Sequence, residues 1–108
     1  MVNSAERIKV TDMTYPNPYK VIATIKSISN PCSSGHKVGE SFEFDGMELK
    51  GRLCTDAFDA IYRNVAIMMW GGEVPWMRGK DKILLNPCPD AHSQVIFELK
   101  RVKKEKKP

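Results

Sequence analysis

The chain has 108 residues, of which 42% are hydrophobic and 28% are charged, and its formal net charge is +4. A chain of this length forms one domain with its own core and needs neither metal nor disulfides to support it. No apolar stretch approaches the roughly 20 residues that span a bilayer, and residues 1–10 contain no hydrophobic signal segment. We therefore expect a soluble protein without membrane contact, whose three cysteines are free thiols in a reducing cytoplasm.

The positive charge is concentrated at the C-terminus. Residues 100–108 hold six basic residues and one glutamate, so this segment carries +5 and the rest of the chain −1. We expect residues 1–102 to form one domain and residues 103–108 to form a solvated basic tail. The pattern argues against nucleic-acid binding, because single-strand binders interleave several aromatic side chains with their charges and only Phe97 lies near this segment.

The hydrophobic pattern predicts several short strands. β-branched residues alternate along residues 20–29, after the segment Pro16-Asn17-Pro18, and apolar side chains alternate with polar ones in 41–44 and 94–102. Residues 82–85 form a further expected strand, and residues 47–53 form a brief strand or an irregular connection. Residues 8–11 are an additional short candidate.

One amphipathic helix is expected from about Asp56 to Trp70. Apolar residues recur there at spacings of three and four, as in Phe58, Ile61, Val65 and Met68. Thr55 or Asp56 can cap the helix, and Gly71-Gly72 can end it. We expect the run from Met68 to Trp70 to lie in the core, and Trp76 to cover the core or to form the wall of a pocket.

The order of these elements predicts an α+β domain. Its small, mainly antiparallel sheet would carry one principal helix packed on one face. A partly closed β-barrel with one helix is the alternative architecture.

Each of the three cysteines lies beside turn-forming residues. Cys32 and His36 are separated by three residues, a spacing that lets a thiolate and an imidazole ligate one ion from a tight loop. Zinc takes four ligands, and Cys54 and Cys88 would complete a Cys3His set, although structural zinc sites usually present close cysteine pairs. The candidate metal ligands are therefore Cys32, His36, Cys54 and Cys88, with Asp56, Asp90 and His92 as alternatives.

Cys54 is also a candidate catalytic nucleophile. It lies just before the expected helix, where unpaired amides and the helix dipole favour a thiolate. A cysteine nucleophile needs a base, and His36 or His92 would serve if the fold brings one of them close.

Three functional classes remain open from these residues. They are a small domain that binds a transition metal or small ligand, a thiol-dependent enzyme, and a protein-interaction or homo-oligomeric module without catalysis. In the simplest interpretation, the cysteines are buried packing residues and His36 only fixes its turn by a hydrogen bond. Phosphate-binding loops and the serine-hydrolase and zinc-protease motifs are absent from the sequence.

Four segments together resemble a family of short prokaryotic proteins. The family shares a C…GHxxGD-F segment, a C-x-x-A-F helix start, a PW pair and a CPD turn. The corresponding segments here are Cys32…Gly35-His36-Lys37-Val38-Gly39-Glu40-Ser41-Phe42, Cys54-Thr55-Asp56-Ala57-Phe58, Pro75-Trp76 and Cys88-Pro89-Asp90. The similarity covers residues 20–101 and departs from the family at residues 48–53, which lack its Pro-x-Gly turn. The resemblance implies a shared site at the cysteine and Gly-His positions and carries over no activity.

Overall fold

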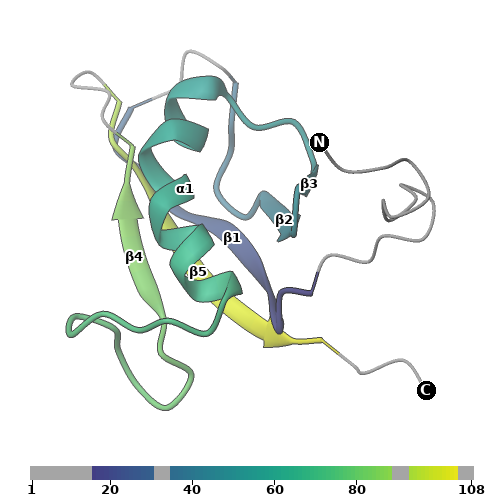
Figure 1. Ribbon diagram of the computed structural model, residues 1–108. Helices are drawn as coiled ribbons and strands as arrows, with labels where there is room; N and C mark the ends of the chain where they lie inside the picture. Colours follow the sequence, from purple (N-terminus) through teal and green to yellow (C-terminus); the bar gives the residue numbers. More distant parts are fainter. Residues whose placement is uncertain (1–15, 31–34, 89–92, 105–108) are drawn as a thin grey trace, which may run out of the picture.

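The structure, a computed structural model, describes residues 16–30, 35–88 and 93–104. Its elements in chain order are β1 (Tyr19–Ile28), β2 (Ser41–Asp45), β3 (Glu48–Lys50), α1 (Thr55–Met69), β4 (Leu84–Pro87) and β5 (Val95–Lys103). The strands form one antiparallel sheet in the order β3-β2-β1-β5-β4, and α1 lies across one of its faces (Figure 1). The α+β prediction is confirmed, whereas the barrel alternative is wrong because the sheet does not close.

The core lies between α1 and the inner face of the sheet. The central strand β1 directs Val21, Ala23 and Ile25 into it, because successive side chains of a strand point to opposite faces. From the other side, α1 contributes Ile61 and Val65, which lie one turn apart and are fully buried. No helix in the described part of the chain is long and apolar enough to cross a membrane.

Both ends of α1 differ in detail from the sequence-based expectation. Cys54 is the N-cap, and its Sγ atom accepts a hydrogen bond from Ala57 N, so the expected cap at Thr55 or Asp56 is wrong by one or two residues. At the other end, Gly71 takes the expected left-handed conformation with φ +84°. Met68 and Met69 lie in the core as expected, whereas Trp70, the C-cap residue, is 50% exposed.

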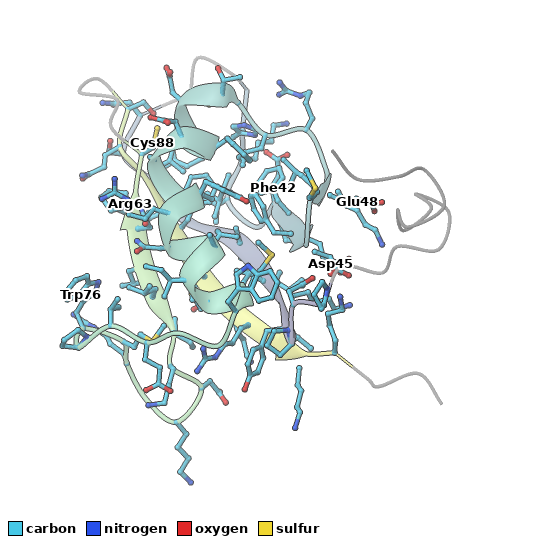
Figure 2. The ribbon with its side chains drawn as sticks, in the orientation of Figure 1. Phe42, Asp45, Glu48, Arg63, Trp76 and Cys88 are labelled. Atoms are coloured by element: carbon cyan, nitrogen blue, oxygen red, sulfur yellow. The ribbon has the colours of Figure 1, made fainter. Side chains whose placement is uncertain are left out.

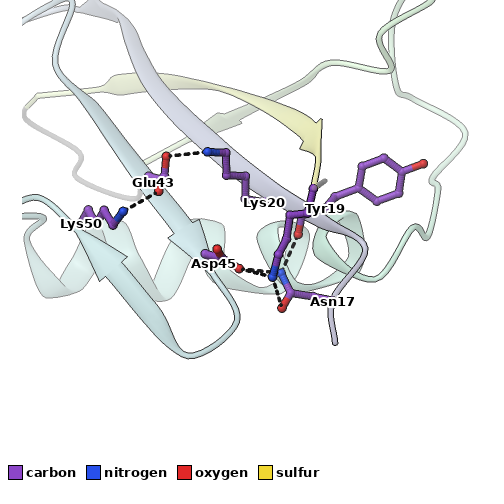
Figure 3. Close-up of polar contacts among 7 residues, drawn as sticks. Asn17, Tyr19, Lys20, Glu43, Asp45 and Lys50 are labelled. Carbon is purple, nitrogen blue, oxygen red and sulfur yellow. Dashed lines mark hydrogen bonds and ion pairs between the residues drawn. The ribbon is translucent and has the colours of Figure 1, made fainter. Parts of the chain in front are cut away.

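A polar cluster joins both ends of the described chain to β2. Lys104 Nζ lies 2.8 Å from Asp45 Oδ1, and Asn17 donates a hydrogen bond to the same oxygen at 3.0 Å (Figure 3). The strand β5 ends at Lys103, and the amide of the next residue, Lys104, donates a hydrogen bond to Pro18 O. The candidate strand at residues 8–11 lies outside the described residues.

Candidate functional site

A groove of about 690 Å³ lies between α1 and the edge strand β4. Its helix wall presents one exposed face of α1, and its other wall combines β4 with the loop that precedes it. Residues from both walls line it: Asp59, Ala60, Arg63, Asn64, Ile67, Val74, Trp76, Leu85, Asn86 and Pro87. Because α1 lies across the inner face of the sheet and β4 is its last strand, the groove opens at the edge of the sheet.

Two asparagines join the walls at the base of the groove. Asn64 on α1 donates a hydrogen bond from Nδ2 to Oδ1 of Asn86 on β4. The side chain of Asn86 also donates to Ala60 O at 3.4 Å, and Asn86 is only 7% exposed. The side-chain oxygen and nitrogen of Asn86 thus both bond to α1. A buried amide that is satisfied in this way holds the helix and the strand at a fixed separation, so the groove is preformed.

Large side chains of the residues that line the groove reach solvent. Trp76 is 63% exposed and Leu85 is 47% exposed. Arg63 projects from α1 toward the β4 side of the molecule, the side on which Trp76 also lies (Figure 2). Trp76 had been expected to cover the core or to form the wall of a pocket, and the structure places it on the wall.

Within the part of the chain that the structure describes, the backbone edge of β4 is open at Leu85. Cys88 N donates a hydrogen bond to Val95 O at 2.8 Å, so Cys88 and Val95 form a hydrogen-bonded pair. Bonded and non-bonded pairs alternate along an antiparallel ladder. The pair of Leu85 with Glu98 is therefore non-bonded, and the amide and carbonyl of Leu85 point away from β5. Before Leu85, Ile83 is paired with Arg78 through two backbone hydrogen bonds. After it, Pro87 has no amide hydrogen, which blunts the edge. A strand added here would bond mainly to Leu85.

The structure brings together two of the residues predicted to form a Cys/His site. Cys54 N donates a hydrogen bond to His36 Nε2 at 3.1 Å, and His36 Nδ1 lies 3.3 Å from Glu40 Oε1. The imidazole is buried, with 1% of its side chain exposed, and its ring meets Phe42 edge-on. Both ring nitrogens are therefore occupied by protein partners, and His36 fastens its loop to the start of α1.

Glu40 completes this arrangement. Its Oε1 accepts a hydrogen bond from Lys37 N at 2.6 Å as well as facing His36. The Lys37 amide, with a smaller contribution from His36, lowers the pKa of Glu40. An ionised Glu40 orients the imidazole with Nδ1 protonated, which leaves Nε2 as the acceptor for the Cys54 amide.

The other predicted ligands do not join this pair within the described residues. Cys88 is buried in the core after the end of β4 (Figure 2), and Cys54 packs against the same core. Cys32, Asp90 and His92 lie outside the described residues, and within them no three His, Cys, Asp or Glu side chains form a metal-binding group. The four-ligand site of Cys32, His36, Cys54 and Cys88 stays a prediction.

No protein-family model, curated protein or solved structure matches the chain.

A second, smaller hollow of about 140 Å³ lies on the opposite side of α1. Phe44, Phe58 and Tyr62 stack along it, and Met47 reaches solvent at its rim. Phe58 had been expected to face the core, and instead it is 37% exposed in this stack. The hollow is far smaller than the groove beside β4.

Four residues of the groove were not predicted from the sequence as site residues, namely Arg63, Asn64, Leu85 and Asn86. One signal was present: Leu85 follows Leu84 in a short strand, so one of two adjacent large apolar side chains must face away from the core. Nothing in the sequence indicates that Leu85 and Trp76 line one groove with α1.

Proposed function

We propose that the protein is a binding domain that holds an extended segment of a partner protein in the groove between α1 and β4. The observation that carries this proposal is the exposure of Trp76 along a groove that lies between α1 and the sheet edge. Exposed aromatic side chains at rigid concave surfaces are typical of interfaces, where a partner removes them from water.

The edge strand supports an extended ligand. Peptides that add to a sheet edge gain main-chain hydrogen bonds, while pockets beside the edge select alternate side chains. Here the amide and carbonyl of Leu85, which point away from β5, offer one such pair of hydrogen bonds. Since the bridge at Ile83 and the ring of Pro87 limit further pairing, most of the binding energy would come from side chains in the groove.

The two tryptophans of the chain allow a direct test. Peptides selected from a random phage-displayed library on the full-length protein would be titrated into the variant Trp70→Phe, which retains Trp76 as its only indole. We expect binding to shift the emission of Trp76, and the matched variant Trp76→Phe, which retains Trp70, to show no comparable shift.

Affinity gives the second readout of the same experiment. We expect Trp76→Ala to weaken binding by about tenfold or more, as for a central aromatic residue of an interface. Tyr62→Ala, in the hollow on the opposite side of α1, should change affinity less than about twofold. A library that yields no peptide sensitive to Trp76→Ala would contradict the proposal.

A second candidate function is supported by the contact between His36 and Cys54. Because Nε2 lies 3.1 Å from Cys54 N, bond geometry keeps it within about 7 Å of the thiol sulfur. Among the described residues, Cys54 and Cys88 form no disulfide. We propose thiol reactivity at Cys54, or zinc binding that adds Cys32 and Cys88, as the alternative to peptide binding.

Two measurements test this alternative. A reactive Cys54 would be alkylated by iodoacetamide much faster than the other cysteines near neutral pH, as mass spectrometry of the modified peptides would show. A metal site would retain close to one equivalent of zinc in protein purified without added metal. Uniformly slow alkylation together with less than about a tenth of an equivalent of metal would exclude both forms.

A further inference from the structure

We infer that the groove selects a segment carrying a carboxylate next to an apolar side chain, with the carboxylate on Arg63 and the apolar group against Trp76. This inference rests on the proposed function and specifies the chemistry of the ligand. It follows from the charges that line the groove and from the apolar side chains beside them.

Arg63 is an available cation. Many of the described basic side chains are engaged in ion pairs, namely those of Lys20, Lys26, Lys50, Lys82, Lys100, Arg101 and Lys104. Arg63 has no hydrogen-bond or ion-pair partner among residues 16–30, 35–88 and 93–104, and it lines the groove. A guanidinium group binds a carboxylate through two parallel hydrogen bonds, which fixes orientation as well as charge.

The opposite charge on the same wall limits what binds. Asp59 lies one turn before Arg63 on α1 and also lines the groove, and the two form no ion pair with each other. A polyanion such as a nucleic acid would bring phosphates against Asp59, which is repulsive. A single carboxylate placed at Arg63 avoids this repulsion, so the groove favours an acidic peptide over a polyphosphate.

The apolar part of the ligand has its own surface. Trp76 lines the groove and is 63% exposed, and the partly buried apolar residues Ile67 and Val74 line the same groove. Removing the exposed indole of Trp76 from water on binding gives affinity, because apolar burial contributes in proportion to area, whereas the charge contact gives selectivity. A segment that offers only one of the two features would use half of the site.

The test uses the selected peptides and charge variants of the full-length protein. For peptides with Asp or Glu beside an apolar residue, we expect Arg63→Gln to weaken binding by about tenfold. Replacing the peptide carboxylate by its amide should weaken binding by a similar factor. The two changes together should weaken binding little more than either change alone, since both remove the same contact between Arg63 and the peptide carboxylate.

Charge reversal and a matched arginine complete the design. The variant Arg63→Glu should bind most tightly to the peptide in which lysine replaces the acidic residue. Arg78→Gln removes the same charge from an exposed arginine outside the lining of the groove and should change affinity less than about twofold. Equal losses from Arg63→Gln and Arg78→Gln would overturn the inference, because they would indicate a general charge effect.

Other outcomes separate this inference from the proposed function. Peptides without carboxylates that depend on Trp76 and not on Arg63 would overturn the inference and leave the peptide groove in place. Peptides whose affinity depends on neither Trp76 nor Arg63 would overturn both the inference and the proposed function. Tighter binding of an oligothymidylate than of any peptide, lost in Arg63→Gln, would show that the groove takes a nucleic acid and would overturn the inference.

Discussion

The imidazole of His36 accepts a hydrogen bond from the backbone amide of Cys54 across 3.1 Å. This bond joins a loop next to β2 to the N-cap of α1, two parts of the chain that are eighteen residues apart. The same ring is held from its other side by Glu40 and packs on Phe42. His36 is thereby a structural connection between loop, sheet and helix.

Substitution of His36 should destabilise the fold. We expect His36→Ala to lower the free energy of unfolding by about 2–4 kcal/mol, because it removes a buried ring and a hydrogen-bond acceptor. His36→Phe keeps a ring against Phe42 but cannot accept from Cys54 N, so its smaller loss would measure the hydrogen bond. Urea unfolding followed by circular dichroism provides both values. A loss below about 1 kcal/mol for His36→Ala would contradict this role.

Cys54 should contribute to stability as a helix cap. Its Sγ atom accepts from Ala57 N at 3.4 Å, and a serine hydroxyl at this position can form the same bond with better geometry. We expect Cys54→Ser to be more stable than Cys54→Ala by about 1 kcal/mol in urea unfolding. Equal stabilities would show that the cap contributes nothing, and retention of any thiol-dependent activity in Cys54→Ser would exclude Cys54 as a nucleophile.

Gly51 occupies a position that admits no side chain. Its φ is +116°, and an added Cβ would lie 2.8 Å from Cδ1 of Phe42, which is itself buried in the core. We expect Gly51→Ala to lower the free energy of unfolding by more than about 2 kcal/mol, because the backbone strain at positive φ and the steric clash with Phe42 add to each other. Gly79→Ala is the matched control, since its φ is +74° with nothing within 4 Å of the added atom, and it should cost only about 1 kcal/mol. Similar losses in the two variants would contradict the clash with Phe42.

Asp45 should make stability depend on pH in the acid range. Hydrogen bonds from Lys104 and Asn17 lower the pKa of Asp45 below its ordinary value. A depressed folded-state pKa stabilises the fold above the unfolded value of about 3.9, and this contribution disappears as the pH falls through the folded value. We therefore expect the stability difference between wild type and Asp45→Asn to be largest near neutral pH and to shrink below about pH 4.

Glu48 offers the control for this measurement. It is exposed and lies on the neighbouring strand β3, and it has no ion-pair or hydrogen-bond partner among the described residues (Figure 2). Glu48→Gln should follow the pH profile of the wild type. A difference between wild type and Asp45→Asn that is independent of pH would contradict the role of Asp45.

The local elements could be predicted because short-range patterns encode them. Alternation of small and β-branched side chains around Val21 and Ala23 predicted β1 to within one residue, and the spacing of Ile61 and Val65 predicted α1. The cap was assigned wrongly because side-chain oxygen is the usual acceptor at this position, and here a thiol two residues from Asp56 takes its place.

The sequence by itself determined the number of layers, the helix and the antiparallel sheet, since periodicity of apolar residues depends only on neighbours along the chain. Only the tertiary structure decided which distant side chains meet. The strand order puts β4 at the sheet edge, and this order is what brings Trp76, Leu85 and Arg63 to one groove. The contact of His36 with Cys54 likewise depends on how the loop before β2 packs against α1, which no local pattern specifies.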